Sequence, residues 1–207
     1  MKVILVNGSP NAEGCAYTAL MEVAKTLEKE GIEAELFQLG KKPVSGCIAC
    51  FKCHESGRCA IPDKVNEFLE KAGTADGFVF GSPVHFASAS GAITSFMDRV
   101  FFAPDRNIFY LKPAAAVVSA RRAGNTATFD QLNKYFTICQ MPVIPSTYWN
   151  MVHGWQPSDV MQDLEGLQTM RILARNMAWF LKCKEAGNKA GIPFPKQEEP
   201  IATNFIR

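Results

Sequence analysis

Four of the chain's seven cysteines lie within residues 47–59, CIACFKCHESGRC, where they could bind metal or take part in redox chemistry. Their spacing, C-x2-C-x2-C-x5-C, is close to compact runs in which three cysteines and a fourth bind a [4Fe-4S] cluster. A structural zinc site more often uses two well-separated C-x2-C pairs. The alternative is a loop of reduced thiols that holds no metal. The candidate ligands are Cys47, Cys50, Cys53 and Cys59.

The beginning of the sequence predicts no export signal. Its apolar run at 3–6 is followed at once by Asn7-Gly8, whereas a signal peptide needs a longer apolar core and a cleavage site. No stretch approaches the roughly 20 apolar residues of a membrane span. We therefore expect a cytoplasmic protein with no membrane partner, in which thiols stay reduced and 47–59 forms no disulfides.

The composition is that of an ordinary globular protein, with 207 residues, 47% hydrophobic and 20% charged. This length is enough for one domain with a large core. The net charge of +2, without a block of Lys or Arg, predicts no nucleic-acid partner. We expect a single domain over 1–186 and an irregular tail over 187–207. Cys139 and Cys183 are interpreted as small buried apolar residues.

Apolar runs and helical patterns alternate along the chain. The run at 2–7, KVILVN, is continuous, as expected for a strand buried on both faces. Strands are predicted at 2–7, 33–39, 77–82, 113–119 and 142–146. Helices are predicted from about 16 to 31, from the cap Asp63 to 72, over 91–100, over 126–139 and from about 158 onward.

Five apolar strands separated by helices indicate βαβ units and a parallel sheet with helices on both faces. Such sheets bind ligands at the carboxyl ends of their strands, beside the point where the strand order reverses. We therefore expect chemistry in the loops after the first, third and fourth strands.

The first of these loops, NGSPNAEGCAYT at 7–18, joins a strand to a helix. The free backbone N–H groups of the first helical turn, at about 15–18, could bind phosphate. The loop contains no lysine and no G-x-G-x-x-G, so it is neither a Walker loop nor a typical dinucleotide fingerprint. The alternative is an ordinary strand–helix turn rich in small residues.

The other two loops carry groups suited to a flat ring. In GSPVHFASAS, at 81–90, an apolar and aromatic stretch could face such a ring, although His85 could equally be structural. In SARRAGN, at 119–125, Arg121 and Arg122 could stabilise an anionic ring, or could be a solvated pair. Together the three loops fit a mononucleotide that lies across the strand ends.

Three segments carry a resemblance to a known family, namely 8–18, GSPVHFASASGAITSFMDR at 81–99, and 119–125. The chain resembles the flavodoxin-like NAD(P)H-dependent FMN reductases, and within them the iron–sulfur flavoprotein branch. The resemblance implies a doubly wound five-stranded parallel sheet of order 2-1-3-4-5 that binds FMN. It also implies a homodimer or a dimer of dimers, with the flavin near the subunit interface.

The resemblance also implies a role for each loop. The phosphate would be held by Ser9, Asn11, Cys15, Ala16, Tyr17 and Thr18. The flavin ring would be bordered by Pro83, Val84, His85, Phe86, Ser119, Arg121, Arg122 and Gly124. Two positions depart from the family pattern, because relatives often have tyrosine at the position of His85 and a hydroxyl or amide residue at that of Cys15.

The activity that the resemblance implies is hydride transfer from NAD(P)H to FMN, followed by electron transfer to a quinone, an azo or nitro compound, a flavin or a protein partner. No catalytic side chain is expected, since the flavin does the redox work. One alternative is an iron–sulfur flavoprotein that carries electrons and has no small-molecule substrate. Others are a flavodoxin-type carrier and a nucleotide-binding regulatory domain whose cysteines bind zinc. The choice between NADH and NADPH stays open.

Overall fold

The computed structural model describes residues 1–103, 108–199 and 201–203, and its centre is a parallel β-sheet. The strand order is β2-β1-β3-β5-β6, and each neighbouring pair is parallel. A sixth, two-residue strand, β4, pairs antiparallel with β3. The strands are β1 (Lys2–Asn7), β2 (Glu33–Gln38), β3 (Gly77–His85), β4 (Ser88–Ala89), β5 (Ala114–Ala120) and β6 (Met151–His153).

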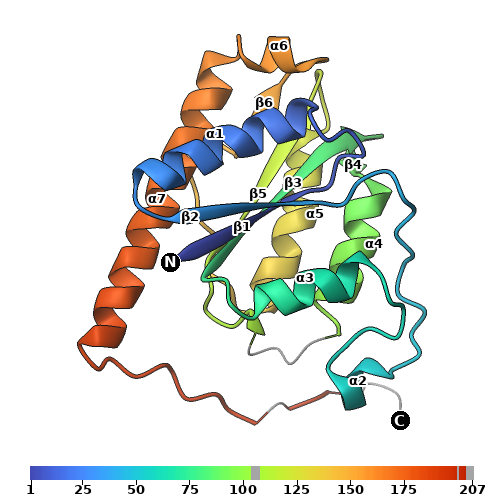
Figure 1. Ribbon diagram of the computed structural model, residues 1–207, viewed down its shortest axis with the longest axis vertical. Helices are drawn as coiled ribbons and strands as arrows, with labels where there is room; N and C mark the ends of the chain where they lie inside the picture. Colours follow the sequence, from blue (N-terminus) through green and yellow to red (C-terminus); the bar gives the residue numbers. More distant parts are fainter. Residues whose placement is uncertain (104–107, 200, 204–207) are drawn as a thin grey trace.

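Helices cover both faces of this sheet (Figure 1). The helices α1 and α7 pack against each other on one face, and α3, α4 and α5 lie on the other. The helices are α1 (Cys15–Lys29), α2 (Cys53–Ser56), α3 (Lys64–Ala72), α4 (Gly91–Val100), α5 (Asn125–Ile138), α6 (Pro157–Val160) and α7 (Leu164–Lys189).

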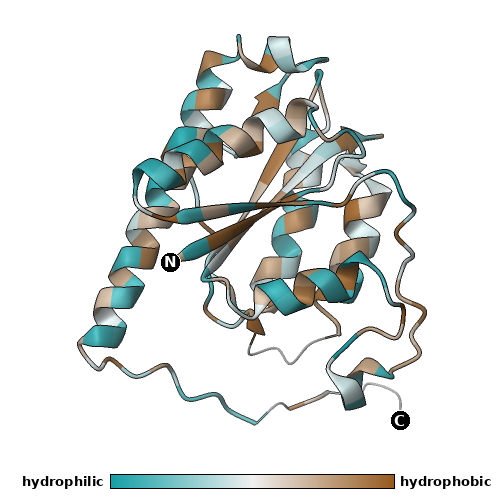
Figure 2. Ribbon diagram, in the orientation of Figure 1, coloured by the Kyte–Doolittle hydropathy of each residue, from teal (hydrophilic) through white to brown (hydrophobic). Residues whose placement is uncertain are grey.

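Alternation along the strands divides the buried residues between two cores. In β1, Val3 and Leu5 belong to the core under α1 and α7, whereas Ile4 and Val6 belong to the core under α3, α4 and α5. All four side chains are fully buried. A strand buried on both faces is apolar at every position, as the run KVILVN predicted. Figure 2 shows hydrophobic residues along these central strands.

Two predicted helix ends are confirmed, one by a hydrogen bond and the other by its backbone conformation. The side chain of Asp63 accepts a hydrogen bond from the backbone N–H of Val65, so Asp63 is the N-cap of α3. Gly31 has φ +79° immediately after the end of α1, the left-handed conformation that glycine adopts at low cost.

The predicted strand at 142–146 is wrong. Residue Val143 makes only an isolated bridge to Ala114, and the edge position beside β5 is taken by β6. Pro142 and Pro145 cannot donate backbone hydrogen bonds, which weakens pairing there. The expected order 2-1-3-4-5 therefore describes the parallel strands alone, and the sheet has six strands rather than five.

The long helix predicted from about residue 158 is two helices. The short α6 ends at Val160, and α7 begins after Asp163, whose carboxylate accepts a hydrogen bond from the N–H of Gly166. The second helix continues to Lys189, and no helix or strand follows among residues 192–199 and 201–203. Cys183 is exposed rather than buried as expected.

Within the described residues, none of the helices is both long and apolar enough to cross a membrane.

Candidate flavin and cysteine sites

The loop after β1 is built from its own side chains and from the end of β2. The side-chain oxygen of Asn7 accepts from the N–H of Ser9 at 3.1 Å, and its amide donates to Gln38 Oε1 at 2.6 Å. Gln38 in turn donates to the carbonyl of Ser9 at 2.7 Å. The hydroxyl of Ser9 accepts from the N–H of Asn11 at 3.1 Å. These bonds fix the loop at the carboxyl edge of the sheet.

This loop leads into α1, whose N-terminus suits an anion. Among the described residues, no side chain caps the helix at Gly14, and the first turn has no acidic residue. The first N–H groups of a helix have no partner within the helix, and the helix dipole places positive charge there. Cys15, Ala16 and Tyr17 supply these groups, so this end of α1 fits the phosphate of a mononucleotide. The N–H of Thr18, also expected to bind phosphate, instead donates to the carbonyl of Gly14 at 3.0 Å.

The predicted second loop, 81–90, is mostly a strand and a hairpin. β3 continues to His85 and turns through Phe86 and Ala87 into β4. Both turn residues have positive φ, +51° and +59°, which is costly for side chains other than glycine. Phe86 is fully exposed. Strain of this kind persists only where the surroundings hold it, and it is common at binding sites.

Hydrogen bonds tie the hairpin to neighbouring elements. The hydroxyl of Ser88 and the N–H of Ala89 both meet Gln131 Oε1 of α5, at 2.8 and 3.0 Å. On the other side, Ser90 donates from its hydroxyl to the carbonyl of Gly8 at 2.9 Å. The hairpin is therefore held between the first loop and α5.

The loop after β5 is the third of the predicted strand-end loops, and it lies beside the β3–β4 hairpin. Gly124 has φ +92°, and a Cβ there would lie 2.7 Å from Ala87 Cα, so the third loop lies against the hairpin. The N–H of Gly154, after β6, donates to the carbonyl of Ala120 at 3.0 Å. The guanidinium of Arg121 lies 6.0 Å from the centroid of the exposed Trp155 ring. All the predicted strand-end loops thus meet at one edge of the sheet.

The positions expected to border a flavin ring differ in accessibility. Ser119 is buried, Pro83, Val84 and Gly124 are partly buried, and His85, Phe86, Arg121 and Arg122 are exposed. Cys15 is partly buried and donates from Sγ to the carbonyl of Gly154 at 3.6 Å. Burial, with a smaller contribution from Asp159, raises the pKa of the Cys15 thiol, so it is held as a neutral donor.

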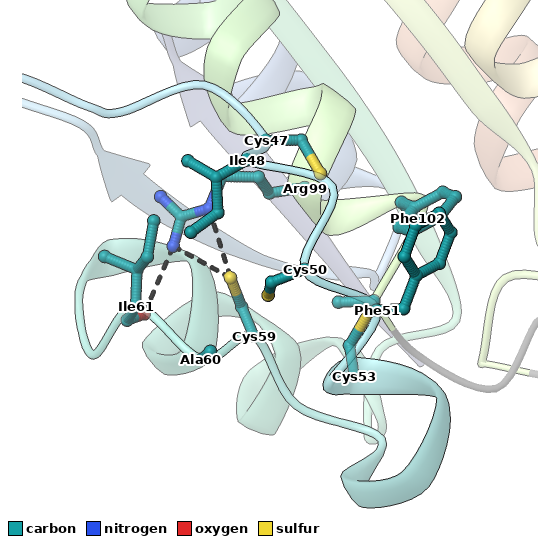
Figure 3. Close-up of a pocket in the computed structure, with 11 residues that line it drawn as sticks. Cys47, Ile48, Cys50, Phe51, Cys53, Cys59, Ala60, Ile61, Arg99 and Phe102 are labelled. Atoms are coloured by element: carbon teal, nitrogen blue, oxygen red, sulfur yellow. Dashed lines mark hydrogen bonds between the residues drawn. The ribbon is translucent and has the colours of Figure 1, made fainter.

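The four cysteines of 47–59 lie together, away from the strand ends. Cys47, Cys50, Cys53 and Cys59 all line one cavity beside Arg99 and Phe102 (Figure 3). Its volume is about 20 Å³, room for one water. Among the described residues no group of three His, Cys, Asp or Glu is arranged to hold a single metal ion.

The donor set nevertheless suits a cluster better than a single ion. A [4Fe-4S] cluster is held by four cysteine thiolates, each on its own iron, so its ligands need not converge on one point. Burial, with smaller contributions from the Cys59, Cys50 and Cys47 sulfurs, raises the pKa of Cys53 and outweighs a backbone hydrogen bond that lowers it. Neighbouring thiolates repel one another, and a bound cation would offset this repulsion and favour the deprotonated cysteines. The loop must widen to admit such a group.

The backbone around Cys50 is strained. Its neighbours Ala49 and Phe51 have φ of +50° and +57°, an unusual pair for residues other than glycine. The Phe51 ring lies 6.0 Å from that of Phe102 and 5.5 Å from that of His54. Of these rings, those of Phe51 and Phe102 line the cavity.

The backbone of Cys59 is held by α3. Asn66 accepts from the N–H of Cys59 at 2.9 Å and donates to its carbonyl at 2.8 Å. Arg99, in the last turn of α4, donates to the sulfur of Cys59 and to both carboxylate oxygens of Asp63 (Figure 3 draws the bonds to Cys59). Burial lowers the pKa of Arg99, but these bonds outweigh it, and the pKa is raised overall.

Comparison with known protein families identifies the family of the chain. The family described as NADPH-dependent FMN reductase matches residues 1–156, three quarters of the chain. The chain belongs to this family. A curated relative, an iron-sulfur flavoprotein of Methanocaldococcus jannaschii, is 36% identical over 191 residues, which cover 88% of this chain and 98% of the relative. A second such protein of that organism is 28% identical over 185 residues, 83% of this chain and 92% of the relative. Within the family, these relatives place the chain in the iron–sulfur flavoprotein branch.

Solved structures confirm the flavodoxin-like α/β fold of the chain. An archaeal flavodoxin superposes with a TM-score of 0.61 at 15% identity, covering 88% of this chain and 99% of that one. An NAD(P)H:quinone oxidoreductase from Methanothermobacter marburgensis gives 0.65 at 17% identity, covering 86% and 96%.

Sequence reasoning missed several residues of the two candidate sites. Gln38 and Ser90 hold the first loop, and Asn66 and Arg99 hold Cys59. Arg99 lies in the segment 81–99 that carries the family resemblance, which was a usable signal, although it gave no role for the arginine. Ser90 lies in the same segment, but its partner Gly8 is 82 residues away. Gln38 and Asn66 belong to none of the motifs that the sequence shows.

Proposed function

We propose that the protein is an FMN-dependent oxidoreductase that takes hydride from NAD(P)H and passes electrons to a small acceptor or to an electron-transfer partner. The observation that carries this proposal is the meeting of the strand-end loops around the uncapped N-terminus of α1. Membership of the FMN reductase family supports it. The candidate acceptors are quinones, azo or nitro compounds and free flavin.

The chain's own groups would bind and orient the cofactor. The phosphate would accept hydrogen bonds from the N–H groups of residues 15–17 and from the side chains of Ser9 and Asn11. The ring would lie along Pro83–Phe86 on one side and the loop of Ser119, Arg121, Arg122 and Gly124 on the other. When bound, FMN accepts hydride and releases electrons singly or in pairs. The exposed arginines would stabilise negative charge on the reduced ring.

A second cofactor, a [4Fe-4S] cluster on Cys47, Cys50, Cys53 and Cys59, is proposed on the observation that all four line one cavity. The names of the iron-sulfur flavoprotein relatives support it. With the cluster, the protein would pass electrons between a two-electron donor and one-electron acceptors. Its partner could then be another redox protein.

The deciding experiment is anaerobic purification followed by a visible spectrum, cofactor analysis and assay. We expect one FMN per chain, and steady oxidation of NADH or NADPH with a quinone present. Flavin without turnover would instead indicate a carrier, and a colourless protein would refute the proposal.

The cluster is tested separately by Cys50→Ala. We expect this variant to lose iron, sulfide and the brown absorption and to keep its FMN. Cys183→Ser, which alters an exposed cysteine of α7, is the matched control and should keep both cofactors. Equal iron content in both variants would exclude a cluster at this loop.

A further inference from the structure

Arg99 is a buried cation placed at the cysteine loop. Its side chain is 1% exposed. Nη1 donates to Asp63 Oδ2 at 2.6 Å and to the carbonyl of Ser45 at 3.2 Å. Nη2 donates to Asp63 Oδ1 at 2.8 Å and to the carbonyl of Ile61 at 3.1 Å. Arginine keeps its charge when buried, so the guanidinium stays a cation in its ion pair with Asp63.

Two donors of the same guanidinium also meet one sulfur. Nε and Nη2 lie 3.2 and 3.1 Å from Cys59 Sγ. Asn66 holds the Cys59 backbone at both its N–H and its carbonyl, which fixes the backbone that carries this sulfur. A bidentate arginine contact suits a negatively charged acceptor, which a metal-bound thiolate is.

We propose that Arg99 is a positioning residue that raises the reduction potential of the cluster through Cys59. This inference rests on the proposed second cofactor. Hydrogen bonds to ligand sulfurs and nearby positive charge stabilise the reduced form of an iron–sulfur cluster, which carries one more negative charge. The relevant step is the uptake of one electron, in which Arg99 keeps all its protons and no bond at Cys59 breaks.

Arg58 provides a matched comparison. It is one residue from Cys59, but its side chain is 60% exposed and its guanidinium pairs with Glu70 at 2.6 Å. A charge in water is screened, so Arg58→Gln removes a positive charge next to the same ligand without removing a bond to its sulfur.

The test is a redox titration of wild type, Arg99→Gln, Arg99→Lys and Arg58→Gln after anaerobic reconstitution, followed by electron paramagnetic resonance. We expect Arg99→Gln to shift the cluster's midpoint potential to a more negative value. Arg99→Lys should shift it in the same direction, because an ammonium cannot offer two donors in a fixed fork. Arg58→Gln should match wild type, and the flavin potential should be the same in all four proteins.

Several results would overturn the inference. A loaded Arg99→Gln cluster at the wild-type potential would do so, and if that variant did not load, Arg99→Lys at the wild-type potential would do the same. Loss of the cluster from both would assign Arg99 to assembly instead. A wild type that takes up no iron would refute the second cofactor itself, and so is distinguishable from failure of Arg99 alone.

Discussion

At the scale of single residues, Gly124 determines how closely two loops of the flavin site approach. Its φ of +92° lies in the left-handed region. A Cβ at this position would lie 2.7 Å from Ala87 Cα and 2.8 Å from Val84 Cγ1. The first of these is backbone of a turn that is already strained, so it cannot move at low cost.

We expect Gly124→Ala to destabilise the protein by about 1–3 kcal/mol and to weaken FMN binding about tenfold. Thermal unfolding and fluorescence titration with FMN would measure the two effects. Gly91→Ala is the control, because a Cβ at Gly91 meets nothing within 4 Å and Gly91 begins a helix. A wild-type melting temperature and FMN affinity in Gly124→Ala would contradict this account of the loop.

At the scale of elements, α4 connects the two candidate sites. Its N-cap, Ser90, bonds to Gly8 in the phosphate loop, and Arg99 in its last turn bonds to Cys59. Ten residues at 1.5 Å each separate these ends by about 15 Å. One helix therefore contacts the first flavin loop at its beginning and the cysteine loop at its end.

Another element-scale feature is the edge strand β2, which is held by ion pairs of Glu35. This carboxylate bonds to Lys2 of β1 and, at 2.7 Å, to Lys71 of α3. The hydrogen bond from Lys2, followed by that from Lys71, lowers the pKa of Glu35. A lowered native pKa means that the stabilisation is present above the ordinary pKa of 4.5 and is lost as the pH falls through the native value.

We expect Glu35→Gln to lower the free energy of unfolding by about 1 kcal/mol or less at pH 7. The difference from wild type should shrink below about pH 4.5, and urea unfolding between pH 7 and 3 would follow it. Glu33→Gln is the control, since Glu33 is 67% exposed and its contact with Lys2, at 3.6 Å, is longer than those of Glu35. A difference that stayed constant with pH would show that Glu35 stabilises the strand by some other means.

At the scale of the whole molecule, exposed aromatic side chains lie on the β3–β4 turn and on the segments just before and after β6. Phe86, Tyr148, Trp149 and Trp155 each expose half or more of their surface. Exposed aromatic groups of this kind are typical of protein interfaces. They agree with the expectation that the protein forms a homodimer or a dimer of dimers with the flavin near the interface.

We expect the 22.8 kDa chain to sediment as a dimer or larger species. Phe86→Ser should weaken this association without lowering the stability of the single chain, in which that ring is fully exposed. Trp179→Ser, at an exposed aromatic residue on α7, should leave the association unchanged. A monomeric wild type at micromolar concentration would refute the expectation.

The sequence by itself determined the type and order of most elements, because periodicity and caps are local. The strands at 2–7 and 33–39 and the helices at 63–72 and 91–100 follow directly from apolar spacing and from Asp63. It also showed the cysteine spacing and the three loops, since each is a contiguous segment. Where pairing decides the structure, local patterns were not enough, and the edge strand formed at Met151–His153 rather than at 142–146.

Only the tertiary structure decided which residues support the sites. Cys59 and Arg99 are 40 residues apart, and Gly8 and Ser90 are 82 apart, so no local pattern links them. Such contacts arise because packing of α4 against the sheet brings its two ends to different loops. The residues that could do chemistry lie in short contiguous segments, which the sequence shows. The hydrogen bonds that orient these residues depend on long-range packing, which only the tertiary structure shows.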